Sequence, residues 1–144
     1  MNELHDIALA RLRAINQRYT DGRRELVDRL SAAAAPVTIP ELLALGDASM
    51  AQSSAYRNLA VLEQAGVVHR ITASGDFARF ELAEDLTEHH HHLICSRCGA
   101  VEDFTAPVAL ERTLGRAVEE IASAHGFDAR QHRLDLIGVC ERCA

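Results

Sequence analysis

The sequence predicts an α+β protein, with an N-terminal winged helix-turn-helix domain followed by a C-terminal α/β domain. The first half contains no cysteine and repeats apolar residues at helical spacing until a short two-stranded pattern begins. The second half holds all four cysteines and six of the eight histidines. Because residues 84–88 are polar and acidic, we expect domains at 1–83 and 89–144 with a hinge at 84–88.

Two helices are predicted at the start of the chain. The first covers residues 3–17, where apolar side chains recur along one face. The second begins at Thr20 or Asp21, which are good cap residues, and stops before Pro36. His5, in the first helix, is interpreted as a surface residue.

Two further helices are predicted before the two-stranded pattern. Thr38 caps a short third helix, with Glu41 three residues later completing a capping box. A longer fourth helix is expected from Ser49 to Gly66, where Gln52 completes a second box and the glycine ends the helix.

A hairpin is predicted directly after the fourth helix. Residues 67–71 and 77–82 read as short strands, and Ser74, Gly75 and Asp76 as the turn between them. This order of elements is typical of a winged helix-turn-helix, in which the longer helix enters the major groove of DNA. A small helical domain with a polar surface is the alternative that the pattern leaves open. The residues predicted to read DNA lie near the start of the fourth helix: Gln52, Ser53, Ser54, Tyr56 and Arg57.

Charge and hydropathy restrict the partners of the chain. A net charge of −6 argues against binding nucleic acid through bulk electrostatics, although a small reading surface is compatible with it. The chain has no lysine, and arginine is well suited to bidentate contacts with phosphate and guanine. No apolar run is long enough to span a membrane, and Glu3 and Asp6 stand where a secretory signal would need positive charge. We therefore expect a cytoplasmic protein without a membrane partner.

The second half reads as strand, helix and strand. Residues 92–94 lead into the first cysteine pair, and 101–104 form a short strand after it. A helix with one apolar face is expected from Pro107 to Gly126. A last strand at 134–139 leads into the second cysteine pair.

The four cysteines form two C-x-x-C turns, Cys95 with Cys98 and Cys140 with Cys143. Two such turns supply the four thiolates of a tetrahedral structural zinc site. Two independent redox pairs are the alternative, but neither pair lies in a thioredoxin-like βαβ context. We expect the metal to fasten the last strand to the start of its domain and to supply folding energy.

Four consecutive histidines, residues 89–92, precede the first cysteine turn. On a strand, alternate side chains point to opposite faces, so His90 and His92 would face one way and His89 and His91 the other. One short segment could thus supply ligands to two metal sites, and imidazole suits zinc, iron and nickel. A solvated polar linker is the alternative interpretation.

Several blocks resemble the ferric uptake regulator family over nearly the whole chain. Residues 53–59 and 65–68 are similar to its reading helix and wing entry, and residues 89–99 to its hinge and first zinc turn. Residues 124–127, His132 and the closing cysteine pair follow in the family's order. The resemblance implies a homodimeric, metal-dependent repressor of metal homeostasis genes that binds double-stranded operator DNA and is not an enzyme. It also implies that the C-terminal α/β domain is a dimerisation domain with structural zinc.

The resemblance implies three metal sites. The structural zinc is held by Cys95, Cys98, Cys140 and Cys143. The regulatory site at the hinge uses His69, Glu81, His90 and His92. A second regulatory site uses His89, His91, Glu111 and His132, with Glu119 or Glu120 as the alternative carboxylate.

Zinc is the predicted regulatory metal, because His69, Glu81 and two hinge histidines suit tetrahedral geometry. Iron-responsive members often place a histidine before the third helix, whereas residues 35–38 here offer no ligand, so Fe²⁺ is the alternative. Nickel, manganese and peroxide sensing follow behind it. A metal store or chaperone and a zinc hydrolase are rival functions outside the family, but the chain lacks an H-E-x-x-H motif.

Overall fold

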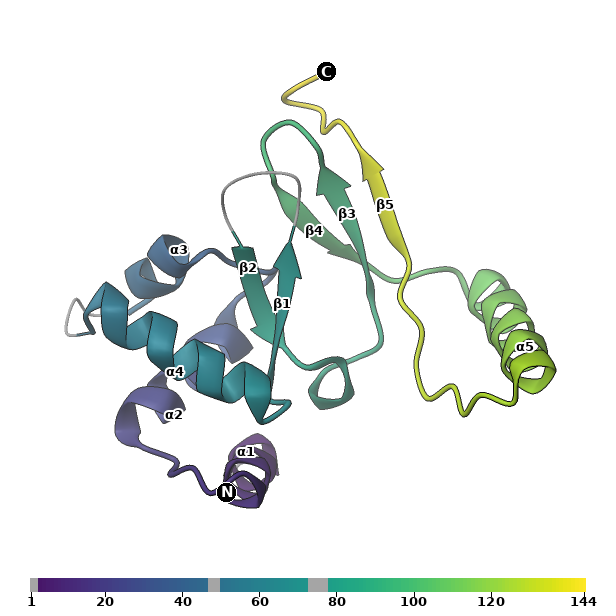
Figure 1. Cartoon of the computed structure of the whole chain (residues 1–144). Helices are drawn as coiled ribbons and strands as arrows, with labels where there is room; N and C mark the ends of the chain where they lie inside the picture. Colours follow the sequence, from purple (N-terminus) through teal and green to yellow (C-terminus); the bar gives the residue numbers. More distant parts are fainter. Residues whose placement is uncertain (1–2, 47–49, 73–77) are drawn as a thin grey trace.

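The computed structural model describes residues 3–46, 50–72 and 78–144, which form two units (Figure 1). The winged-helix unit extends from the first helix to a β-hairpin, and the C-terminal unit consists of a three-stranded sheet and one long helix. The predicted α+β class, with a winged helix-turn-helix followed by an α/β unit, is confirmed. None of the helices in the described ranges is both long and apolar enough to cross a membrane.

The winged-helix unit follows the predicted order of elements. Its helices and strands are α1 (Glu3–Ala14), α2 (Asp21–Ala32), α3 (Ile39–Ala44), α4 (Gln52–Gln64), β1 (Val68–Thr72) and β2 (Ala78–Leu82). Thr20 caps α2, and Thr38 and Glu41 form the predicted capping box of α3. Apolar side chains from all six elements bury one core, among them Leu12, Leu26, Leu42, Leu59, Val68 and Phe80.

Two predicted helix ends were wrong. The first helix ends at Ala14, because Asn16 adopts a left-handed conformation (φ 59°) and Gln17 N–H donates to the carbonyl of Leu12 (2.9 Å). The fourth helix begins at Gln52 and its cap residue, Ala51, has no side-chain hydrogen bond. The predicted cap Ser49 and the predicted turn 74–76 lie outside the described residues.

His5 was also wrongly interpreted as a surface residue. Its ring is buried between α1 and α2, where Nδ1 lies 2.6 Å from the hydroxyl of Tyr19 and Nε2 lies 2.7 Å from Oδ1 of Asp28. These contacts satisfy both ring nitrogens, as burial of a polar group requires.

The hairpin β1–β2 is the wing. Its strands are antiparallel, with Val68 opposite Leu82 and His69 opposite Glu81. Val37 adds an isolated bridge to Phe80, through hydrogen bonds of 3.0 and 2.8 Å, and so ties the start of α3 to the wing. Phe80 and Leu82 face the core, as their alternation in the sequence predicted.

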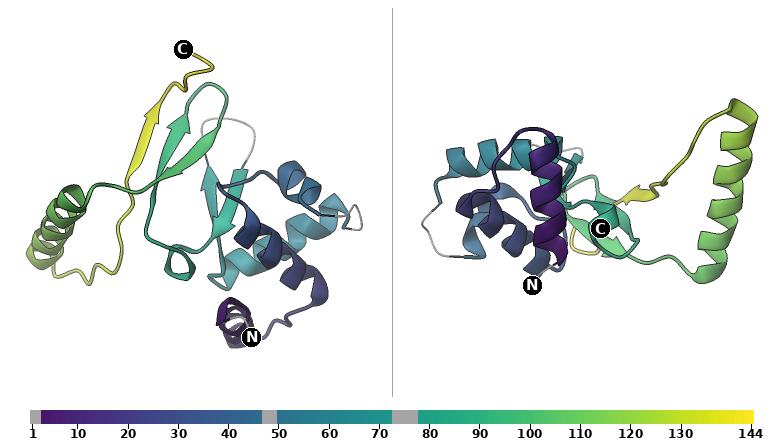
Figure 2. Two further views of the ribbon diagram at one scale, coloured as in Figure 1. Left: turned by 180° about the vertical axis from the view of Figure 1, so that it is seen from behind. Right: turned by 90° about the horizontal axis from the view of Figure 1, so that it is seen from below.

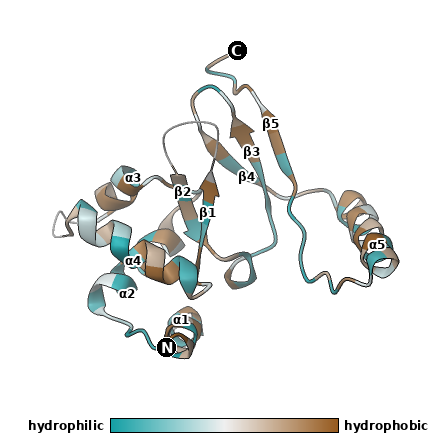
Figure 3. Cartoon of the chain, viewed as in Figure 1, coloured by the Kyte–Doolittle hydropathy of each residue, from teal (hydrophilic) through white to brown (hydrophobic). Residues whose placement is uncertain are grey.

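The C-terminal unit is an open sheet in the order β4-β3-β5. Its elements, after the short 3₁₀ helix η1 (Glu84–Leu86), are β3 (His91–Cys95), β4 (Val101–Phe104), α5 (Val108–His125) and β5 (Asp135–Gly138). β3 pairs antiparallel with β4 and parallel with β5. Helix α5 stands away from the rest of the chain (Figure 2), and it buries none of its residues although one face is apolar (Figure 3).

Candidate metal centres

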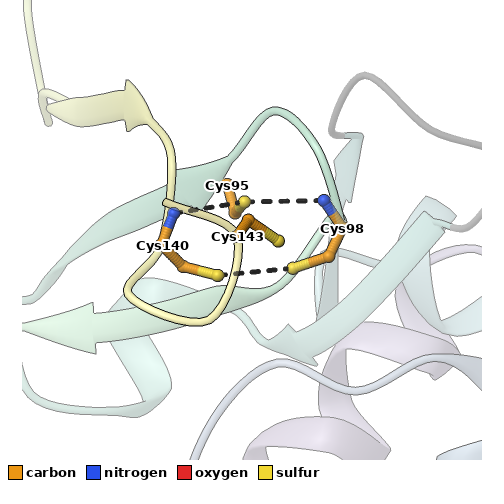
Figure 4. A group of neighbouring side chains, drawn as sticks. All are labelled: Cys95, Cys98, Cys140 and Cys143. Atoms are coloured by element: carbon orange, nitrogen blue, oxygen red, sulfur yellow. Dashed lines mark hydrogen bonds between the residues drawn. The ribbon is translucent and has the colours of Figure 1, made fainter.

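The four cysteines lie together at one end of the C-terminal sheet (Figure 4). Cys95 ends β3, and the parallel pairing of Cys95 with Gly138 brings the turn after β5 alongside. The four sulfur atoms lie within 4.8 Å of one another, and Sγ of Cys98 is 3.7 Å from Sγ of Cys140. All four side chains are free thiols, so their clustering suits metal binding.

The sulfur cluster is electrostatically prepared for a cation. Backbone N–H groups of Cys98 and Cys140 point at Sγ of Cys95 and lower the pKa of that thiol to about 6. The hydrogen bond between Cys143 and the sulfur of Cys140 raises the pKa of Cys143 to about 12, because that bond is lost when the Cys143 thiol gives up its proton. A dication would take the place of this shared proton, and four converging sulfurs are the arrangement of a structural zinc site.

A second cluster joins the two units at the hinge. Its ligand atoms, which lie within 4.8 Å of one another, belong to Glu81, His90, His92 and Asp103. Nε2 of His90 is 3.0 Å from Oε2 of Glu81, and Nε2 of His92 is 2.9 Å from Oε1. Asp103 lies opposite His92 in the β3–β4 pairing and approaches the same nitrogens at 3.8 and 3.4 Å. Glu81 comes from the wing and the other three residues from the C-terminal unit.

The imidazole rings of His90 and His92 are oriented by the partners of their Nδ1 atoms. Nδ1 of His90 donates to the carbonyl of Glu88 (2.8 Å), and Nδ1 of His92 faces Oδ1 of Asp135 (3.5 Å). Such partners fix the tautomer that leaves Nε2 free as a metal ligand. In the described part of the chain, Oδ1 of Asp103 is buried without a hydrogen bond, which fits an atom that coordinates a metal.

Charge in the hinge cluster is strongly coupled. Burial would raise the pKa of Glu81, but the polar contacts with the imidazoles of His69, His92 and His90 outweigh it and lower the pKa to about 2. Burial would lower the pKa values of His90 and His92, yet the nearby Glu81 carboxylate, together with the Glu88 carbonyl for His90, raises both. Burial and the charge of Glu81 raise the pKa of Asp103. A cavity of about 500 Å³ borders the cluster and gives an ion a route from solvent.

A third cluster lies wholly in the C-terminal unit. Its ligand atoms belong to His89, His91, Glu111 and His132, again within 4.8 Å of one another. Oε2 of Glu111 is 3.1 Å from Nε2 of His89 and 3.3 Å from Nε2 of His132, while Oε1 meets Nε2 of His91. The hydrogen bond from His91 lowers the pKa of Glu111. The alternative carboxylates, Glu119 and Glu120, lie further along α5 and are not in the cluster.

The residues predicted for each of the three metal sites therefore lie close together, with one difference. The alternation of the histidines holds although β3 begins only at His91. His69 lies 3.7 Å from Glu81 and borders the hinge cluster, whose fourth member is Asp103. Asp103 was not among the predicted ligands, because only the pairing of β3 with β4 brings it opposite His92. Its place in the short strand predicted at 101–104 showed that a carboxylate lay nearby, but the register that pairs it with His92 cannot be read from the sequence.

The family model of the ferric uptake regulators matches residues 14–137. This chain belongs to the ferric uptake regulator family. Proteins of this family are metal-responsive transcriptional regulators and not enzymes, and this member is a metal-responsive regulator.

Relatives of this family member are named for different regulatory systems. The peroxide operon regulator of Bacillus subtilis is 31% identical over 95% of this chain and 91% of its own length. The solved ferric uptake regulator of Helicobacter pylori is 25% identical, covers 99% of this chain and 94% of its own, and superposes with a TM-score of 0.71. A zinc-bound manganese uptake regulator is 30% identical, covers 96% and 99%, and has a TM-score of 0.63.

In this ferric uptake regulator family member, α4 presents the predicted reading residues to solvent. Tyr56 is 56% exposed near the start of α4. Arg57 is exposed beside it and its Nη2 lies 3.5 Å from Oγ of Ser54. Gln52 and Ser53 are exposed as well, whereas Ala55 and Leu59 anchor the opposite face of α4 in the core.

Proposed function

We propose that this chain is a zinc-responsive, homodimeric repressor that binds operator DNA and controls metal homeostasis genes. The observation that carries the proposal is the hinge cluster, in which Glu81 of the wing converges with His90, His92 and Asp103 of the C-terminal unit. An ion bound there would link the DNA-reading unit to the unit that forms the dimer. Binding of metal and binding of DNA would then be coupled, each strengthening the other.

Two imidazoles and two carboxylates support zinc as the regulatory metal. Four ligand atoms within 4.8 Å of one another suit a four-coordinate ion, which is the common geometry of zinc. His69, 3.7 Å from Glu81, offers a further imidazole at the edge of the cluster.

An iron- or manganese-dependent, peroxide-responsive repressor is the second candidate. Asp103 adds a carboxylate that the sequence analysis did not include, and oxygen ligands favour these harder ions. The Bacillus subtilis relative, which is named a peroxide operon regulator, supports this candidate.

The remaining clusters have separate roles in this proposal. Structural zinc is held by Cys95, Cys98, Cys140 and Cys143. A second regulatory site is formed by His89, His91, Glu111 and His132. We retain the division into residues 1–83 and 89–144 with a hinge at 84–88, since η1 lies in that hinge and the hinge cluster takes ligands from both sides of it.

Exposed apolar side chains support a homodimer. Val108 and Ile121 on α5 are 73% and 61% exposed, and Ile137 on β5 is 72% exposed. A second copy that covers α5 and the sheet edge would bury these side chains, each contributing about 1.5–3 kcal/mol. The two DNA-reading units would then be presented to successive half-sites of an operator.

The residues of the hinge cluster would couple metal binding to the angle between the two units. Without metal, the imidazoles of His90 and His92 are the partners of Glu81 in this cluster, and the winged-helix unit can change its angle to the dimer more readily than with a bound ion. A bound ion supplies a multivalent link between Glu81, His90, His92 and Asp103. The population then shifts toward the one angle at which both reading helices fit the DNA.

Gel shift with operator DNA, titrated with one metal at a time, tests the proposal. Half-maximal binding should occur at the lowest free concentration for Zn²⁺, and chelator should reverse it. The double variant His90→Ala/His92→Ala should remain a folded dimer that ignores added metal. A metal store, chaperone or hydrolase would bind metal without retaining DNA, and activation by Fe²⁺ or Mn²⁺ alone would favour the second candidate.

A further inference from the structure

One face of the wing hairpin points away from its own core and toward the C-terminal unit. Phe80 and Leu82 of β2 are buried in the winged-helix unit, so Arg79 and Glu81 lie on the opposite face. The register pairs Ile71 with Arg79 and His69 with Glu81, which places these four side chains on that outer face.

The guanidinium of Arg79 joins three segments of the chain. Its Nε donates to the carbonyl of Gly99 (2.8 Å), in the turn that carries Cys98. Its Nη1 donates to Oε1 of Glu41 (2.8 Å) and to the carbonyl of Pro36 (3.4 Å). The Arg79 side chain is only 17% exposed and its hydrogen bonds to Gly99 and Pro36 are partly buried, whereas its partner Glu41 is 52% exposed.

An apolar contact lies next to this polar one. Ile71, opposite Arg79 in the hairpin, is 1% exposed and packs with Ile94 of β3 and Val101 of β4. Apolar packing keeps the two surfaces together but does not fix their register, whereas the hydrogen bond from Arg79 to Gly99 is directional. The pair therefore sets where the hairpin sits on the C-terminal sheet.

This position matters for Glu81. Among the described residues of the hinge cluster, Glu81 is the one ligand that belongs to the winged-helix unit. It lies two residues from Arg79 on the same outer face, so a hairpin that slides or lifts carries Glu81 away from His90 and His92. A set of ligands that is already assembled binds its metal ion with less loss of side-chain and hinge conformational entropy.

We propose that Arg79 is a positioning residue for the regulatory metal site. Its side chain docks the wing onto the turn that carries Cys98, and this docking holds Glu81 against His90 and His92. The inference rests on the proposed function, because it requires the hinge cluster to bind the regulatory metal. Arg79 also links the sulfur site to the hinge site, since the turn around Cys98 supplies the Gly99 carbonyl that accepts its hydrogen bond.

Cobalt titration of the full-length, zinc-containing protein tests this role. Each cluster is measured alone, with Glu111→Gln disabling the third cluster or Glu81→Gln disabling the hinge cluster. Arg79→Ala should weaken Co²⁺ binding at the hinge cluster about tenfold, as expected for the loss of a charged hydrogen bond. The third cluster takes no ligand from the winged-helix unit, so its affinity should not change. Arg79→Lys, which keeps the charge beside Glu41 but loses the planar fork, should fall between the wild type and Arg79→Ala.

Arg70→Ala is the matched control on the same hairpin. The Arg70 guanidinium lies over the ring of Phe80 (5.4 Å) and pairs with Glu63 (3.3 Å), both within the winged-helix unit. Its removal should leave cobalt binding unchanged at both clusters.

The outcomes separate the two proposals. If the wild-type hinge cluster binds no cobalt, the proposed function fails. If it binds cobalt with the same affinity in Arg79→Ala and Arg79→Lys as in the wild type, the positioning role is wrong. An equal loss at both clusters would assign Arg79 to general stability and would also overturn it.

Discussion

Asp103 on β4 lies opposite His92 on β3, with its Oδ1 3.4 Å from Nε2 of that histidine. This pairing gives the hinge cluster a second carboxylate in addition to Glu81. Oδ1 of Asp103 is buried with no hydrogen-bond partner in the described ranges, and the pKa of Asp103 is raised by partial burial and by the charge of Glu81. A metal ion would relieve both conditions, which supports the proposal that Asp103 is one of the ligands.

The first prediction concerns Asp103→Asn. Because the amide keeps the shape but loses the charge, we expect the hinge cluster to bind its metal about tenfold or more weakly, with Fe²⁺ and Mn²⁺ losing more than Zn²⁺. Metal-by-metal titration measures the change. Glu102→Gln, an exposed neighbour on the same strand, is the control. Unchanged affinity in Asp103→Asn would leave His69 as the better candidate for the fourth ligand.

The second prediction concerns pH. His90 and His92 must each lose a proton to bind metal, and both have pKa values raised above about 6.5. We therefore expect metal affinity to fall with decreasing pH from a point above 6.5, and DNA binding to fall with it. Affinity that stays flat down to pH 6 would contradict this.

The same groups give the metal-free protein the opposite dependence. The ion pairs of protonated His90 and His92 with Glu81 stabilise the contact between the two units. This stabilisation is fully present below the ordinary histidine pKa. It is lost as pH rises through their raised pKa values. Thermal unfolding of the metal-free protein between pH 6 and 9 should show this loss, and His90→Ala/His92→Ala should abolish it.

The third prediction concerns DNA reading by α4. Arg57→Ala removes an exposed guanidinium beside Tyr56, and we expect operator affinity to fall by about 1–3 kcal/mol at fixed salt. Zinc content should not change, because Arg57 is remote from the metal clusters in sequence and in contacts. Arg130→Ala, whose side chain is 84% exposed in the C-terminal unit, is the control. Equal operator affinities for the two variants would remove Arg57 from the reading surface.

The fourth prediction concerns the sulfur site. Cys98→Ser should release one zinc per chain, detected by elemental analysis, and should strongly lower the unfolding temperature. Structural zinc sites bind with about 10–16 kcal/mol, which becomes folding energy when the apo site is disordered. Ser96→Ala changes a hydroxyl in the same turn and should retain zinc. A Cys98→Ser variant with full zinc content would show that the sulfurs do not hold it.

The fifth prediction concerns dimerisation. Ile137→Arg places a charge on an apolar side chain that is 72% exposed, and we expect the dimer to dissociate at micromolar concentration. Analytical ultracentrifugation gives the assembly state. Ala14→Arg, at the exposed end of α1, is the matched control and should remain dimeric. A dimeric Ile137→Arg would place the interface elsewhere.

The sequence by itself determined the local elements and the chemistry of the ligands. Helix caps such as Thr38 with Glu41, the two C-x-x-C turns and the alternation within residues 89–92 depend on neighbours a few positions away, so they can be read directly. Two predictions from local sequence were wrong. The left-handed conformation of Asn16 ends α1 earlier than predicted. His5 was placed at the surface because its partners, Tyr19 and Asp28, are 14 and 23 residues away in the sequence.

Only the tertiary structure decided which distant residues share a site. Asp103 joins His92 through strand pairing, and Arg79 reaches Gly99 because the wing packs on the C-terminal sheet. Neither contact has a signature in the local sequence, since register and docking are set by the burial of side chains such as Ile71 and Ile94 that come from different units. The ligand types were therefore predictable from the sequence, whereas the complete ligand set and the residue that positions it were not.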